Sequence, residues 1–80
     1  MKIEVLGAGC AKCKRLEENV RKAVKEAGVR AEIVKVQDLA QIISTGVIMT
    51  PALLINSKVM AVGRVPGVEE LVRMLKGAGR

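Results

Sequence analysis

The N-terminal part of the chain contains a strand pattern, a helix pattern and a second strand pattern, and this succession constrains the fold most. Lys2–Leu6 is a short apolar-rich run that predicts a strand. Between Ala11 and Ala27, apolar residues recur at i, i+4, i+7, i+8 and i+11, which predicts one amphipathic helix, and Gly28 is placed to end it. Arg30–Val36 predicts a second strand. Two strands joined by a helix of this length form a crossover unit, so we expect them to lie parallel in one sheet.

The rest of the chain adds two helices and two strands. They are a short helix capped by Asp38 and ended by Gly46, strands at Ala52–Ile55 and Lys58–Val62, and a closing helix from Val68 to Gly77. The predicted order is β-α-β-α-β-β-α, an α/β fold with a mixed sheet. Helices should cover both faces, because the central strands are apolar on both sides. We expect residues 1–80 to form one domain, and Met49, Met60 and Met74 to fill its core.

Composition excludes several classes of function. Half of the residues are apolar, yet the chain has no Phe, Tyr, Trp or His. This removes base stacking on aromatic side chains, Ser-His and Cys-His nucleophile pairs, haem histidines and histidine-ligated zinc. The net charge of +6 is compatible with nucleic-acid binding, but the basic residues are spread along the chain. We therefore expect no nucleic-acid partner.

Two further patterns bear on location. The longest nearly apolar stretch, Val47–Ile55, is about half of what a membrane span needs, so no membrane segment is expected. Glu4 and Gly7 interrupt the region where a secretory leader would be unbroken and apolar, which favours the cytoplasm. In that reducing compartment, two cysteines three residues apart indicate catalysis or metal binding before a structural disulfide.

The segment Cys10-Ala11-Lys12-Cys13 stands at the junction of the first strand and the first helix. Unpaired N–H groups and the positive end of the helix dipole favour a thiolate there, and Lys12 adds positive charge. Together these effects typically lower a cysteine pKa from about 8.5 to roughly 3.5–7.5, and Cys10 gains most. Cys13 falls on the same helix face, close enough to form a disulfide. Cys10 can then attack a substrate disulfide and Cys13 can release it.

Two other interpretations of the cysteines stay open. They can be two small buried apolar residues. They can also form a soft-metal site, since two thiolates suit Cu(I), as in ferredoxin-like metallochaperones. Those proteins, however, have the order β-α-β-β-α-β, whereas here a helix follows the second strand and another ends the chain.

Thr50-Pro51 is the second element of the predicted site. If Ala52–Ile55 pairs antiparallel with Lys2–Leu6, Pro51 lies beside Cys10. We expect a cis bond between Thr50 and Pro51, which would expose the Thr50 backbone for pairing with an extended peptide. The alternative is a trans proline that only begins a strand.

These features carry a family resemblance. The segment from Gly7 to Cys13, Thr50-Pro51, the hairpin and the Glu69-Glu70-Leu71 helix resemble the small thioredoxin-like proteins, or redox-active disulfide proteins, of archaea and bacteria. The resemblance spans essentially the whole chain. It implies a minimal thioredoxin fold with sheet order 2-1-3-4, Cys10 as nucleophile, Cys13 as resolving thiol and Pro51 as the cis-proline.

The resemblance also bears on Glu4 and on glutathione. Glu4 precedes Cys10 by six residues, the offset at which thioredoxins keep a buried acid that accepts the proton of the resolving thiol. The alternative for Glu4 is an exposed or ion-paired side chain beside Lys2. Val62-Gly63-Arg64-Val65 stands where glutaredoxins hold glutathione with Gly-Gly-x-Asp, so glutathione is not the expected partner.

We therefore expect a cytoplasmic, monomeric thiol–disulfide oxidoreductase that uses Cys10 and Cys13 and binds its substrate at Thr50 and Pro51. Lys12 and Glu4 are expected to tune the two thiols. Electrons would come from an upstream flavoprotein like thioredoxin reductase and pass to protein disulfides, with no bound cofactor and no metal. The alternatives are a Cu(I) carrier that uses the same two sulfurs and a thioredoxin-like binding module with little turnover.

Overall fold

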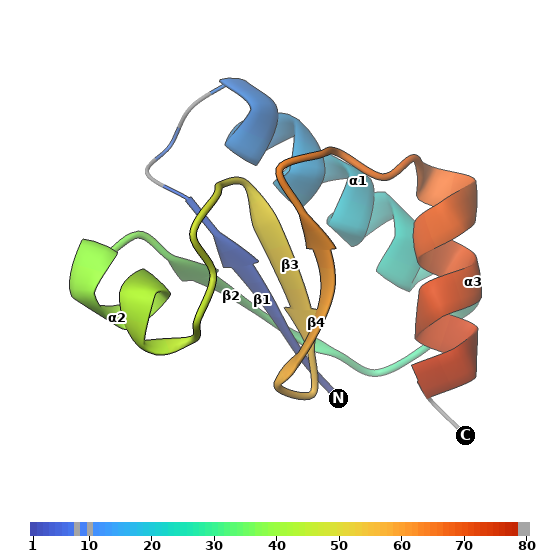
Figure 1. The fold of residues 1–80 in the computed structure, drawn as a ribbon. Coiled ribbons are helices and arrows are strands. Elements are labelled where there is room, and N and C mark those ends of the chain that lie inside the picture. Colours follow the sequence, from blue (N-terminus) through green and yellow to red (C-terminus); the bar gives the residue numbers. More distant parts are fainter. Residues whose placement is uncertain (8, 10, 79–80) are drawn as a thin grey trace.

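The computed structural model describes residues 1–7, 9 and 11–78. The elements are, in order, β1 (Lys2–Leu6), α1 (Ala11–Ala27), β2 (Glu32–Val36), α2 (Leu39–Ser44), β3 (Ala52–Ile55), β4 (Lys58–Val62) and α3 (Val68–Ala78). The sheet order is β2-β1-β3-β4, with β1 parallel to β2 and antiparallel to β3 (Figure 1). The predicted α/β class, the element order and the sheet order are confirmed.

Two element boundaries differ from the prediction. β2 begins at Glu32 rather than at Arg30, because its neighbour β1 begins at Lys2, which is paired with Glu32. Residues before Glu32 have no strand beside them. α3 continues through Gly77 instead of ending there. Gly77 lacks the left-handed backbone seen at Gly28 (φ +68), which does end α1 as predicted.

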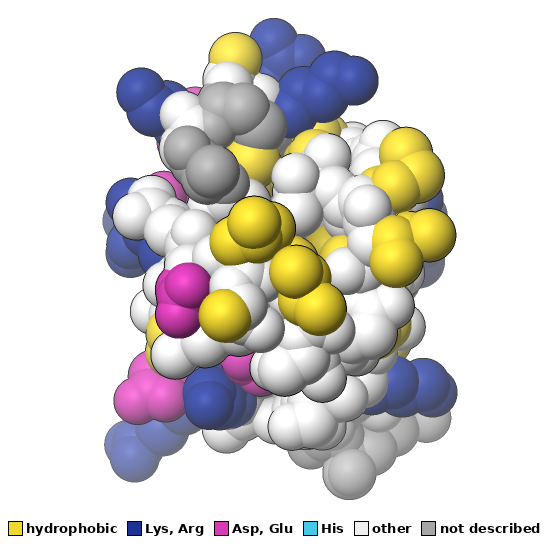
Figure 2. Space-filling model, turned by 60° about the vertical axis from the view of Figure 1, so that its left-hand side comes forward, with side chains coloured by type: hydrophobic (Ala, Val, Ile, Leu, Met, Phe, Trp, Pro, Cys, Tyr) yellow, Lys and Arg dark blue, Asp and Glu magenta, His cyan; other side chains and the backbone are white. Residues whose placement is uncertain are grey.

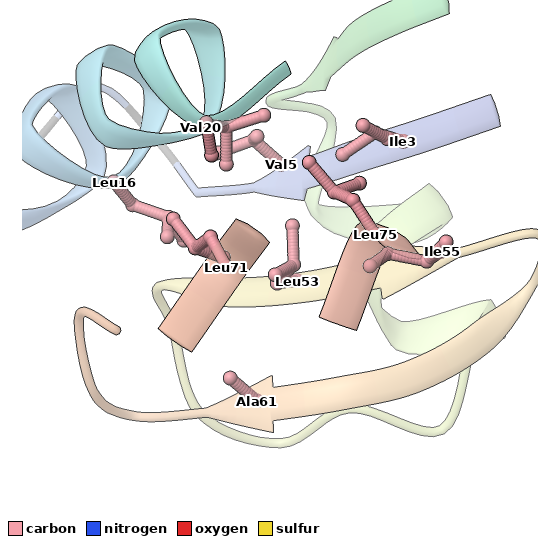
Figure 3. Packing of buried hydrophobic residues seen from close by; sticks show 10 residues of the cluster. Ile3, Val5, Leu16, Val20, Leu53, Ile55, Ala61, Leu71 and Leu75 are labelled. Atoms are coloured by element: carbon pink, nitrogen blue, oxygen red, sulfur yellow. The ribbon is translucent and has the colours of Figure 1, made fainter. Parts of the chain in front are cut away.

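The larger core lies between the sheet and the pair α1 and α3, which cover the same face (Figures 1 and 3). Its side chains come from alternate positions of the strands and from one stripe of each helix. The buried members are Ile3, Val5, Leu16, Val20, Ala23, Leu53, Ile55, Ala61, Leu71 and Leu75. Met60 and Met74 pack against this cluster as expected. Met49 does not, because its side chain is exposed.

The opposite face is covered by α2 and by the segment that follows it (Figure 1). Its core is smaller and consists of Leu6, Val36, Ile42, Val47, Ala52 and Leu54. The Asp38 carboxylate accepts a hydrogen bond from the Ala40 N–H, which confirms Asp38 as the N-cap of α2. A helix this short buries one side chain, that of Ile42, and leaves Leu39 and Ile43 exposed. Helices on both faces are confirmed, but the two layers are unequal.

The hairpin between β3 and β4 turns at Asn56 and Ser57, whose φ angles are 51° and 69°. Positive φ at both central residues is the geometry of a type I′ turn, which matches the twist of the two strands. The Asn56 side chain also accepts a hydrogen bond from the Lys2 N–H at 2.9 Å. This bond ties the hairpin to the start of β1.

Replacing Leu53 with Ala should lower the free energy of unfolding by about 2–5 kcal/mol, because Leu53 is fully buried in the middle of the larger core. Val59→Ala on β4 is the matched control, since Val59 is exposed and should change stability by about 0.5 kcal/mol or less. Urea unfolding of both variants measures the difference. Equal losses in the two variants would contradict this assignment of the core.

Candidate active site

The pairing of β1 with β3 brings two distant loops together at one end of the sheet. Leu6 is paired with Ala52, so Gly7 at the end of β1 comes beside the residues that precede β3. The Thr50–Pro51 peptide bond is cis, as predicted from the sequence. Pro51 is buried and its carbonyl accepts a hydrogen bond from the Gly63 N–H at 2.8 Å, whereas Thr50 is exposed.

Cys13 lies in the first turn of α1, on the helix stripe that faces the sheet. Its side chain is 5% exposed, and the residue takes part in a disulfide bond. Cys13 is therefore shielded from solvent. Cys10, the predicted nucleophile, lies outside the described residues.

Gly7 is the point at which Cys13 and Thr50 meet. A Cβ atom built on Gly7 would overlap the Cys13 Sγ atom and would lie 3.9 Å from the Thr50 Cβ atom. Any side chain at Gly7 would therefore displace the buried sulfur. Gly7 was not among the predicted site residues, and its contact with the Cys13 sulfur was not foreseen. The signal available was a glycine at the strand end, directly before the segment that carries both cysteines.

A small cavity of about 50 Å³ opens beside Cys13. Besides Cys13 it is lined by Val5, Gly7, Gly9, Lys14, Glu17, Lys35 and Gln37. The Glu17 carboxylate accepts hydrogen bonds from Arg21 and lies 3.3 Å from the Lys35 ammonium group. The Arg21 hydrogen bonds, and after them Lys35, lower the pKa of Glu17. Glu17 was not among the predicted site residues, although it follows Cys13 by one helical turn.

The two residues predicted to tune the thiols lie in different places. Lys12 is exposed in the first turn of α1. Glu4 is half-buried on β1, between Val34 and Leu54, which belong to the α2 face of the sheet. Val5, the next residue of β1, lines the cavity beside Cys13, and its side chain points to the opposite face of the sheet, which α1 and α3 cover. Glu4 does not line that cavity. The role of Glu4 as proton acceptor stays a prediction.

Two kinds of feature are absent from residues 1–7, 9 and 11–78. There, no group of three or more His, Cys, Asp or Glu side chains could hold a metal ion. Within the same residues, every helix is too short or too polar to span a bilayer.

The sheet order, the disulfide-bonded Cys13 at the start of α1 and the cis-proline beside Gly7 define a thioredoxin class of fold. Comparison with known proteins agrees, because the family model for the thioredoxin domain matches residues 1–76. A thioredoxin of Methanothermobacter thermautotrophicus is 41% identical over 75 residues, which cover 94% of this chain and 97% of that protein. A thioredoxin of Methanocaldococcus jannaschii is 43% identical over 74 residues, covering 92% of this chain and 85% of that protein. The chain belongs to the thioredoxin domain family, and with that membership it is a thiol–disulfide oxidoreductase.

Replacing Gly7 with Ala should destabilise the oxidised protein by about 1–3 kcal/mol, because the added methyl group overlaps the Cys13 sulfur. Gly67→Ala is the matched control, since a Cβ atom at Gly67 meets open space. Urea unfolding of the two variants measures the effect. If Gly7→Ala were as stable as Gly67→Ala, the close contact between Gly7 and Cys13 would be wrong.

Replacing Glu17 with Gln should lower stability at neutral pH by about 0.2–1 kcal/mol, the range for partly exposed ion pairs. The pKa of Glu17 is lower in the folded protein than in the unfolded chain, so its contribution is present above the unfolded pKa. It is lost as the pH falls through the folded pKa. Urea unfolding at about pH 7 and about pH 2.5 should therefore show the difference between variant and wild type only at the higher pH. A difference of equal size at both values would contradict the ionic origin.

Proposed function

We propose that residues 1–80 act as one domain that reduces protein disulfides by two-step thiol–disulfide exchange between Cys10, Cys13 and the substrate. The observation that carries the proposal is the buried, disulfide-bonded Cys13 at the start of α1, held against Gly7 and beside Thr50. Cys10 is the only other cysteine of the chain, and it precedes Cys13 by three residues. We take Cys10 as its redox partner.

In the first step the Cys10 thiolate attacks one sulfur of the substrate disulfide. The other substrate sulfur leaves as a thiolate and takes up a proton. In the second step Cys13 loses its proton and attacks the Cys10 sulfur, which releases the second substrate thiolate. The protein is left with a disulfide and the substrate with two thiols, so two electrons have moved to the substrate.

The burial of Cys13 supports this division of roles. A sulfur with 5% of its residue exposed is poorly placed to meet a disulfide on another protein, but it is already within bonding distance of its own disulfide partner. The first attack therefore falls to Cys10. Lys12, which is exposed in the same turn, adds positive charge that favours a Cys10 thiolate.

Thr50 supports a binding role beside the cysteines. It is exposed, and its backbone makes no hydrogen bond within the described residues. An extended substrate segment can pair with the N–H and C=O groups of Thr50 and so lie beside Cys13. Pro51, which is buried, holds Thr50 in place through the hydrogen bond between its carbonyl and Gly63.

The partners follow from the chemistry. A dithiol that has been oxidised must be reduced again, and we assign this step to a flavoprotein like thioredoxin reductase. We place the monomeric protein in the cytoplasm, where thiols are kept reduced. The Cu(I) carrier is disfavoured because the chain has the β-α-β-α-β-β-α order rather than that of the ferredoxin-like metallochaperones.

Replacing Cys13 with Ser should trap a mixed disulfide between Cys10 and a protein substrate, because the second step needs the Cys13 thiol. Non-reducing electrophoresis and mass spectrometry after mixing with an oxidised protein measure the trapped species. Cys10→Ser is the matched control and should trap none, since the remaining sulfur is buried.

Equal trapping by both variants would contradict the division of roles between the cysteines. Wild-type reduced protein that bound Cu(I) tightly and reduced no disulfide would contradict the exchange mechanism. That second result would support the metal carrier.

A further inference from the structure

Cys13 must lose a proton in the second step of the proposed exchange, and the fold leaves that proton few places to go. The Cys13 side chain is buried, so bulk water does not reach its sulfur freely. Burial also disfavours the charged form of any thiol. The group that accepts the proton should therefore lie in the cavity of about 50 Å³ beside Cys13.

Of the described residues that line this cavity, Glu17 alone is acidic. It follows Cys13 by four residues in α1, so the two side chains lie on the same helix face. The other charged groups around the cavity are cations, Lys14 on α1 and Lys35 on β2. The first turn of α1 contains no acidic residue, and Figure 2 shows Lys and Arg side chains gathered at the top of the molecule, the end at which α1 begins in Figure 1. Glu17 is therefore a carboxylate in a basic region.

Lys35 holds one oxygen of the Glu17 carboxylate at the cavity. Lys35 is paired with Val5 in the sheet, so both side chains lie on the face that α1 covers. The Lys35 Nζ atom lies 3.3 Å from Glu17 Oε1, whereas the two hydrogen bonds that Arg21 donates to Glu17 reach Oε2. Within the described residues Oε1 has no second partner, and a carboxylate oxygen has two lone pairs. Oε1 can therefore accept one more hydrogen bond.

The cavity is large enough for a water molecule that joins Cys13 to Oε1. Its volume of about 50 Å³ exceeds the roughly 10–15 Å³ that one water needs. Its lining includes Glu17, Lys35 and Gln37, whose side chains end in polar groups. A water there can accept the thiol proton and pass another to the carboxylate. The Glu17 side chain is 18% exposed, so it can afterwards release that proton to solvent.

We propose that Glu17 is the proton acceptor for Cys13 and that Lys35 is the residue that positions it. The inference rests on the proposed redox function and deepens its second step. It gives to a residue of α1 the role that the resemblance implies for Glu4, which lies on the other face of the sheet and does not line the cavity. Because Arg21 and Lys35 lower the pKa of Glu17, the carboxylate is ionised and able to accept a proton at neutral pH.

In the mixed disulfide, the Cys13 thiol loses its proton through the water to Glu17. The Cys13 thiolate then attacks the Cys10 sulfur, and the bond between Cys10 and the substrate breaks. The substrate sulfur leaves with the electron pair of that bond and takes up a proton from water, while Glu17 returns its proton to water. The substrate has gained two electrons over the whole exchange, and the carboxylate is unchanged.

The aromatic disulfide dithiobis(nitrobenzoate) separates the two steps, because each step releases one coloured thiolate. An excess of it makes the first step fast, whereas the second step is intramolecular and does not depend on its concentration. Both phases are followed by stopped flow from about pH 6 to about pH 9. Glu17→Gln removes the acceptor and keeps the size of the side chain. Glu18→Gln is the matched control, because Glu18 is exposed, carries the same charge on α1 and does not line the cavity.

Wild type and Glu18→Gln should show a second phase whose rate changes little between about pH 6 and about pH 8, because Glu17 stays ionised across that range. In Glu17→Gln the second phase should be slower by about a hundredfold at about pH 7, the low end of what general base catalysis contributes. It should also rise with pH, because hydroxide must then take the proton. The first phase should be nearly the same in all three proteins. Lys35→Gln should slow the second phase by a smaller factor and leave its pH profile flat, since the carboxylate remains.

A second phase with the same rate and pH profile in wild type and Glu17→Gln would overturn the inference and leave the redox function intact. A faster second phase in Glu17→Gln would also overturn it, because Glu17 would then act only by its negative charge, which opposes a neighbouring thiolate. A second phase slowed by Glu4→Gln and not by Glu17→Gln would return the role to Glu4. If wild type released one coloured thiolate or none, the two-step redox function itself would be wrong.

Discussion

The contact between the Cys13 side chain and the backbone of Gly7 determines where the chemistry of this protein can occur. β1 is hydrogen-bonded on both sides, to β2 and to β3, so its last residue has a fixed position. Gly7 follows that residue and leaves room for a sulfur where any side chain would fill the space. α1 can then begin close to the end of the strand. Because β3 begins on the other side of Gly7, Thr50 comes to the same place.

The two faces of the sheet carry layers of different thickness, because the helices that cover them differ in length. α1 and α3 are long enough to bury a full stripe of side chains, and they form the larger core with β1 and β3. α2 has six residues and buries one of them. The side chains that α2 leaves exposed form an apolar surface that reaches Thr50. The thinner layer, formed by α2 and the segment before β3, therefore borders the candidate active site at Thr50.

Much of the fold was predictable because its signals are local. Each of these signals depends on a few neighbouring residues. They are the 3.6-residue period of α1, the apolar runs of the strands, the Asp38 cap and the turn at Asn56-Ser57. The errors, in contrast, arise from contacts between distant parts of the chain. β2 is shorter than its apolar run because a strand needs a partner, and β1 offers none before Lys2. Met49 is exposed because it lies over the Gly63 backbone rather than in either core.

The sequence by itself determined the elements, their order and the two cysteines at a strand-to-helix junction, because period, capping and turn geometry depend on neighbouring residues. Only the tertiary structure decided that Cys13 and Thr50 both approach Gly7, and that Glu17 meets Lys35 beside the cysteine. It also decided that Glu4 faces away from that cavity and that Leu39, Ile43 and Ile48 share one groove. The partners in these contacts come from different elements. Strand register and helix packing bring them together, and no local pattern in the chain specifies such distances.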